Sequence, residues 1–94
     1  MTFEEFRSAT SEPDELAAPL RALWQDAEGN WESAHRLVQD DASAEAAWVH
    51  AYLHRKEGDA ANAGYWYARA GKPRFDGSLE SEWEEMVQVL LSSE

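Results

Sequence analysis

The sequence contains no cysteine among its 94 residues. This absence excludes disulfide bonds, thiolate catalysis and the zinc sites that are built on cysteine. A chain without cysteine also fits a reducing compartment, and we therefore expect a cytoplasmic protein.

Long apolar runs and basic residues are also scarce. No segment approaches the roughly 18 apolar residues that a membrane helix requires, and residues 1–10 lack the features of a signal peptide. Eight Lys and Arg against 19 Asp and Glu give a formal net charge of −11. A field of this sign repels phosphate backbones and anionic lipids, so we expect neither nucleic acid nor membranes as partners. Solubility explains this charge most simply, and an acidic face for a basic partner is the alternative.

Catalytic motifs are missing as well. The serines fall at expected caps, turns and the C-terminal tail, and none has a Gly-x-Ser-x-Gly setting. The sequence contains no glycine-rich phosphate loop. These absences weigh against an enzyme without deciding the question.

What the chain does contain is alanine and aromatic residues at helical spacing. Five tryptophans can each bury a large apolar area against alanine. Apolar periodicity predicts helices over residues 19–28, 31–39, 44–57, 60–70 and 79–91, a short helix over residues 2–8 is one interpretation of the N-terminal segment, and no stretch has the alternation of a strand. We expect one all-α domain over residues 1–94, with four to five helices arranged as two stacked α-hairpins and a closing C-terminal helix.

Residues 1–13 allow two interpretations. Thr2 and Glu5 form a capping-box pattern, and Phe3 and Phe6 share one face, which favours a short helix. The following ATSEP segment breaks the pattern, so a loosely held N-terminal arm is the alternative.

Two of the expected helices differ in how much of their surface is apolar. The helix over residues 44–57 is apolar on most sides, which is typical of a buried, central helix. The helix over residues 79–91 has one apolar stripe. We expect its remaining side chains to be mostly solvated, namely Glu80, Glu82, Glu84, Glu85 and Gln88.

A short pattern occurs twice, over residues 29–34 and 58–63. Each copy has glycine, then asparagine or aspartate, and an alanine five residues after the glycine. Repeated helical pairs bury their faces by stacking. Gly58, Ala63, Tyr67 and Ala70 resemble the small-large pattern of a tetratricopeptide helix pair. The resemblance covers about half of the chain. The spacing differs, because 29 residues separate the two glycines whereas the family's repeat has about 34 residues.

A longer resemblance involves residues 22–35, ALWQDAEGNWESAH, and residues 48–73, WVHAYLHRKEGDAANAGYWYARAGKP. Both segments are similar to a family of small bacterial and fungal proteins of uncharacterised function. The resemblance implies a compact helical fold and no particular activity.

His50 and His54 are spaced i, i+4 on an expected helix, a spacing that can bring two imidazoles to one metal ion. Glu57 continues the same face, and His35 can reach it from the neighbouring helix. These four residues form a possible divalent metal site. The HExxH protease pattern is not met, because Ala51 stands where the catalytic glutamate would be. The simpler interpretation is that the histidines are core groups with one hydrogen-bond partner each, and it predicts no cofactor.

Polar side chains gather around the turn at Gly58. These side chains could line a pocket for a small anion, which Arg55 or Arg69 would bind in a bidentate manner. Alternatively, they join the two helices through ion pairs and helix caps, which is the simpler interpretation. Tyr65 is expected on the outer side, beside Asn62 and Arg69, as an exposed contact residue. The full polar set is His54, Arg55, Glu57, Asp59, Asn62, Tyr67 and Arg69.

The leading functional hypothesis is a non-enzymatic protein-interaction module, because stacked α-hairpins commonly present a face to a partner. We expect a protein partner, and a monomer or a weak homodimer. The alternative is a protein that binds a small ligand or a metal, conceivably an enzyme, centred on His50, His54 and Arg55. The candidate contact residues are His50, His54, Arg55, Asn62, Tyr65 and Arg69.

Overall fold

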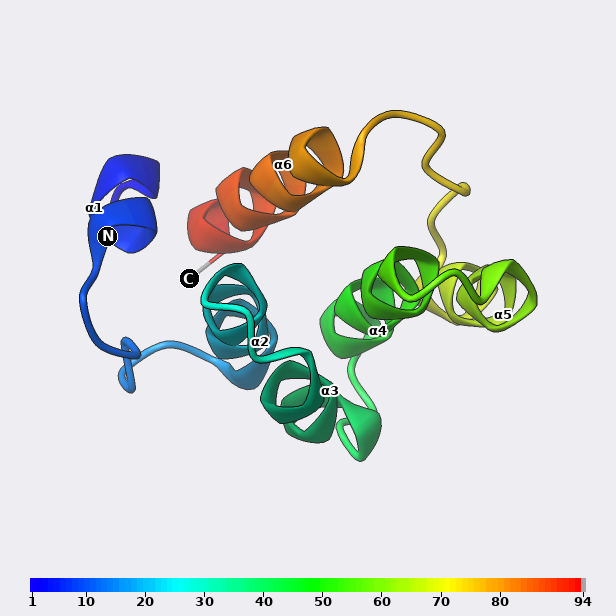
Figure 1. The fold of residues 1–94 in the computed structure, drawn as a ribbon, viewed down its shortest axis with the longest axis horizontal. Coiled ribbons are helices and arrows are strands. Elements are labelled where there is room, and N and C mark those ends of the chain that lie inside the picture. Colours follow the sequence, from blue (N-terminus) through cyan, green and yellow to red (C-terminus); the bar gives the residue numbers. More distant parts are fainter. Residues whose placement is uncertain (94) are drawn as a thin grey trace.

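The computed structural model describes residues 1–93 and contains six helices in that range (Figure 1). They are α1 (Phe3–Ser8), α2 (Ala18–Ala27), α3 (Trp31–Gln39), α4 (Ala44–Lys56), α5 (Ala60–Ala70) and α6 (Leu79–Ser92). The described residues include no strand, so the all-α prediction is confirmed. The expected four to five helices is too few, because the short α1 forms a helix of its own. No helix in the described range is long and apolar enough to span a membrane.

Local signals in the sequence explain where the helices begin and end. Side chains that accept a hydrogen bond from the first turn cap four of the helices: Thr2, Ser43, Asp59 and Ser78. Pro19 lies in the first turn of α2, where its missing N–H costs little. Gly29 and Gly58 have φ values of 86° and 89°, a left-handed conformation that glycine adopts without strain.

Helix α4 is the centre of the domain, as its composition predicts. Every residue from Ala46 to His54 is buried. Helices α3, α5, α6 and α2 all pack against it, and Figure 1 shows α4 between α3, α5 and α6. In Figure 1, α3, α5 and α6 lie in three different directions around α4, so α4 can take part in separate side-chain clusters.

Residues 1–9 are held against the rest of the domain. Phe6 is fully buried, and its ring centroid lies 5.9 Å from that of Trp83 on α6. The Trp24 indole N–H donates to the carbonyl of Ala9 at 3.3 Å. Thr2 and Glu5 form the complete capping box. The structure therefore agrees with the short-helix interpretation of this segment and not with a loosely held arm.

One acid on α6 is not solvated, contrary to expectation. Glu82 is only 1% exposed and accepts hydrogen bonds from Arg55 Nη1 at 2.8 Å and from the Tyr67 hydroxyl. Burial raises the pKa of Glu82, and these hydrogen bonds act against that rise. The carboxylate thus links α6 to α4 and α5.

A second buried acid, Asp26 on α2, has a similar environment. It is 3% exposed and accepts from the Tyr52 hydroxyl at 2.7 Å and from Lys56 Nζ at 2.9 Å. Burial, followed by this hydrogen bond, raises the pKa of Tyr52. Asp26 therefore joins α2 to α4. Together, Glu82 and Asp26 hold neighbouring helices against the central helix.

Candidate metal centre

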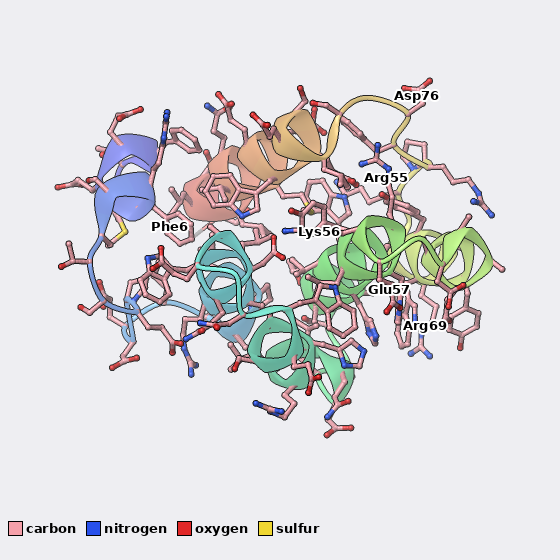
Figure 2. All side chains as sticks on the ribbon, viewed as in Figure 1. Phe6, Arg55, Lys56, Glu57, Arg69 and Asp76 are labelled. Atoms are coloured by element: carbon pink, nitrogen blue, oxygen red, sulfur yellow. The ribbon has the colours of Figure 1, made fainter. Side chains whose placement is uncertain are left out.

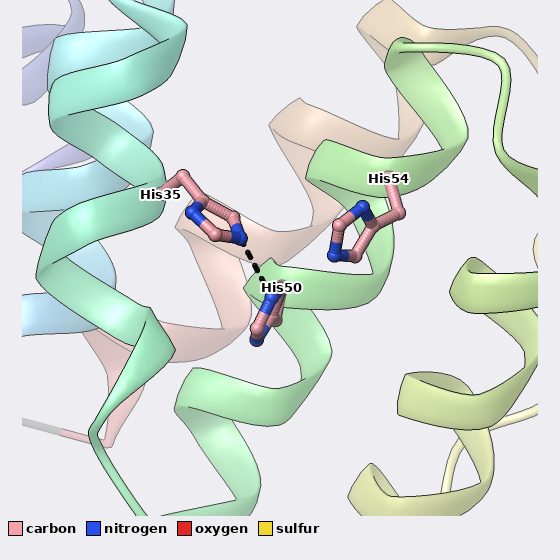
Figure 3. A group of neighbouring side chains, drawn as sticks. All are labelled: His35, His50 and His54. Carbon is pink, nitrogen blue, oxygen red and sulfur yellow. Dashed lines mark hydrogen bonds between the residues drawn. The ribbon is translucent and has the colours of Figure 1, made fainter.

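Three histidines converge between α3 and α4, and they are all the histidines of the chain (Figure 3). His50 and His54 lie one turn apart on α4, and His35 reaches them from α3. One ring nitrogen of each lies within 4.8 Å of the others. The shortest separation, between His35 Nε2 and His50 Nε2, is 3.0 Å. The structure brings together the three histidines that the sequence nominated as metal ligands.

Packing of α3 on α4 produces this convergence. Trp31 and His35 are one turn apart on α3, and their rings stack at 5.0 Å with an angle of 8° between the planes. The Trp31 indole N–H donates to the carbonyl of Leu53 on α4 at 2.9 Å. This bond fixes the position of α3 along α4, and with it the side from which His35 approaches.

Helix α5 contributes the opposite side of the cluster. The Trp66 ring stacks on that of His50, with centroids 4.0 Å apart and planes inclined by 19°. Trp31 in turn meets His54 edge-on at 6.3 Å. Two partly buried tryptophans, one from each flanking helix, therefore enclose the imidazoles.

Burial favours the neutral form of the imidazoles. His50 is 4% exposed, and burial, together with the charges of His35 and His54, lowers its pKa to about 4. Burial also lowers the pKa of His35, which is partly exposed. Neutral imidazole is the form that coordinates metals, so His35 and His50 are in their ligating form at neutral pH.

The hydrogen bonding of His50 is incomplete. Its Nδ1 is buried and has no hydrogen-bond partner among residues 1–93. Its Nε2 faces the Nε2 of His35, and two neutral rings can share only one proton across that contact. A cation between these rings would accept both lone pairs. The three imidazole nitrogens are a donor set that could hold a metal ion.

Glu57 supports the cluster from outside. Its Oε1 lies 2.6 Å from His54 Nδ1. With the proton on Nδ1, the ring donates to the carboxylate and Nε2 carries the free lone pair, the arrangement common around metal-bound histidines. Asp59 lies close to the same ring, but its carboxylate caps α5 by accepting from the backbone N–H of Asn62 at 3.1 Å.

Distances in the cluster are close to those of a tetrahedral site. A Zn–N bond of about 2.0–2.1 Å places ligand nitrogens about 3.4 Å apart. His35 and His50 nitrogens already lie 3.0 Å apart, and the third lies within 4.8 Å of both. An ion bound by all three imidazoles would require these nitrogens to lie about 3.4 Å from one another.

Arg55 belongs to a different part of the domain. It pairs with the buried Glu82, donates to the Gly77 carbonyl and lies over the Phe75 ring at 5.5 Å. Figure 2 shows Arg55 on the side of α4 toward α6, opposite Glu57 and Arg69. The polar set around the 58–59 turn thus divides between two faces of α4.

The outer side of α5 holds the remaining candidates. Tyr65 is 54% exposed, and its hydroxyl accepts from Arg69 Nη1 at 3.2 Å. The Arg69 guanidinium carbon lies 5.1 Å from the centroid of Trp66. Asn62 is exposed beside them. Through Trp66, this surface is continuous with the histidine cluster.

Neither tryptophan that encloses the cluster was predicted from the sequence to be part of the site. The i, i+4 spacing of Trp31 and His35 on one helix was a usable signal, since such residues share a face. No comparable signal connects Trp66 with His50, because their contact depends on how α5 packs against α4.

The chain matches no protein-family model, no curated protein and no solved structure.

Proposed function

We propose that this protein binds a divalent transition metal ion through His35, His50 and His54. The observation that supports the proposal is the convergence of three imidazoles on one spot, with a nitrogen of each within 4.8 Å of the others. A second observation is that His50 Nδ1 is buried without a hydrogen-bond partner among the described residues, so the contact of its Nε2 with His35 does not satisfy the whole ring.

Ligand chemistry limits the choice of ion. Three imidazoles without thiolate suit Zn²⁺, Cu²⁺, Ni²⁺ or Co²⁺, whereas Mg²⁺ and Ca²⁺ require oxygen ligands. Three protein ligands around an ion of tetrahedral preference favour Zn²⁺ or Co²⁺. The Glu57 carboxylate next to His54 would raise the basicity of that ligand and fix its tautomer.

Thermal unfolding of the chelator-treated protein, with and without Zn²⁺, tests the proposal. A ligand at a hundredfold excess over its Kd stabilises the native state by about 2.7 kcal/mol. For a domain of this size, Tm should rise on the order of 10 °C. Mg²⁺ at the same concentration should leave Tm unchanged.

A pair of variants on α3 provides the control. His35 is partly exposed, so His35→Ala should fold and lose most of the rise in Tm with Zn²⁺. Its neighbour Arg36 is exposed and contacts Ser33 and Glu32, and Arg36→Ala should keep the full rise. An equal rise in Tm in both variants, or none in the native sequence, would refute the metal site.

An interaction surface is the second candidate function, and the exposed Tyr65 favours it. The ring is 54% exposed and is held by Arg69, as expected of an interface anchor with little freedom to lose. Self-association is the form that is directly testable. Light scattering at high micromolar concentration should show a dimer that Tyr65→Ser reduces and His35→Ala leaves intact; a monomer at that concentration would rule the dimer out.

A further inference from the structure

The protein supplies three ligands to the histidine cluster, and the groups around the cluster are not free to supply a fourth. The Trp31 indole N–H is a donor only and is bonded to the Leu53 carbonyl. Trp66 presents a ring face to His50. Neither tryptophan offers a lone pair to a metal, so the walls of the site cannot complete its coordination.

The nearby carboxylates, Glu57 and Asp59, group with His54 and do not belong to the cluster of His35, His50 and His54. Glu57 accepts from His54 Nδ1 at 2.6 Å, on the side of the ring opposite the nitrogen that is left to coordinate. Asp59 caps the first turn of α5. A carboxylate that orients a ligand in this way lies outside the coordination shell.

We propose that the metal held by His35, His50 and His54 keeps one coordination position open, and that a small exogenous anion occupies it. This inference rests on the metal-binding function proposed above. Three neutral imidazoles leave the 2+ charge of the ion uncompensated at the first shell, which favours an anion over a neutral ligand. The two enclosing tryptophans limit the anion to a small one.

The exposed cation nearest to the Trp66 side of the cluster is separated from the imidazoles by the Trp66 ring. Arg69 is exposed, and its guanidinium carbon lies 5.1 Å from the centroid of Trp66, the ring that stacks on His50. Its recorded hydrogen bond is to the Tyr65 hydroxyl, a neutral group. Arg69 is therefore not a ligand of an anion at the metal, and the charge of the ion itself provides the attraction.

Cobalt substitution followed by azide titration tests the inference. Co²⁺ bound by three imidazoles and a fourth ligand in tetrahedral geometry has a visible absorption that depends on the fourth ligand. We expect one Co²⁺ per chain with such a spectrum, and we expect azide to change the spectrum saturably. His35→Ala should abolish both the tetrahedral Co²⁺ spectrum and its response to azide, and the remote exposed Arg7→Ala should change neither.

The possible failures are distinguishable. No Co²⁺ spectrum with the native sequence would overturn the metal site and this inference together. A tetrahedral Co²⁺ spectrum that azide leaves unchanged would keep the metal site and overturn the open position. The Glu57→Gln variant then identifies the fourth ligand. If Glu57 only orients His54, the variant should weaken Co²⁺ binding by about 10–100-fold and keep the azide response. An azide response that appears only in Glu57→Gln would show that this carboxylate is the fourth ligand of the metal.

Discussion

Acidification should destabilise the metal-free protein through His50. Burial and the neighbouring His35 and His54 lower the pKa of this ring from 6.5 to about 4 in the folded state. In the unfolded chain the ring is solvated and takes up its proton near pH 6.5. The unfolded state therefore binds more protons as the pH falls, so the contribution of His50 to stability is complete above pH 6.5 and is lost toward pH 4.

The expected size of the effect follows from the shift. Integrating the difference in protonation of His50 from pH 7 to pH 5 gives a loss of about 2 kcal/mol. His35 acts in the same direction, because burial lowers its pKa as well. Glu82 acts in the opposite direction, because burial raises its pKa and the folded state therefore holds its proton more tightly. A variant that removes only His50 separates these contributions.

Urea unfolding, followed by tryptophan fluorescence at pH 7 and pH 5 with a chelator present, measures this loss. The native sequence should lose about 2 kcal/mol more between these pH values than His50→Gln does. The exposed Glu84→Gln should show the same pH dependence as the native sequence. If the native sequence and His50→Gln lose the same free energy of unfolding over this range, the ring is not held neutral by burial and the argument fails.

Two further predictions concern stability. Glu82→Ala leaves Arg55 without its buried partner and should lower the free energy of unfolding in urea by about 3–5 kcal/mol. The exposed Glu84→Ala should stay within about 0.5 kcal/mol of the native sequence. A loss below about 1 kcal/mol for Glu82→Ala would mean that the pair is not buried. Phe6→Ala removes a fully buried ring and should cost about 3–5 kcal/mol, and an unchanged midpoint would indicate that α1 does not pack on α6.

Much of the fold was predictable because its signals are local. The helix boundaries follow from caps and glycines that lie within a few residues of each helix end, such as Ser43, Asp59 and Gly58. The burial of α4 follows from its composition, since a helix that is apolar on most sides has to be enclosed.

The misplacement of Glu82 has a clear physical origin. On the helical wheel it belongs with the solvated acids, and periodicity contains no information on what lies opposite it. Arg55 and Tyr67, far away in the sequence, supply the hydrogen bonds that make its burial tolerable. Asp26 follows the same rule, with Tyr52 and Lys56 as its partners.

The candidate site was only partly predictable. The i, i+4 spacing of His50 and His54 placed both on one face of a helix, and His35 entered as a residue from the neighbouring helix. The sequence also grouped Arg55 with them, because it lies next to His54 along the chain. Adjacent residues on a helix point about 100° apart, and the structure places Arg55 on the face toward α6.

The all-helical class, the helix boundaries and the central position of α4 are predictable from the sequence, because they depend on propensities, caps and periodicity within single segments. The contact of His35 with His50, the stacking of Trp66 on His50 and the burial of Glu82 became visible only in the folded domain. Each of these contacts joins two helices, and its geometry is set by how the helices pack, which no single segment encodes.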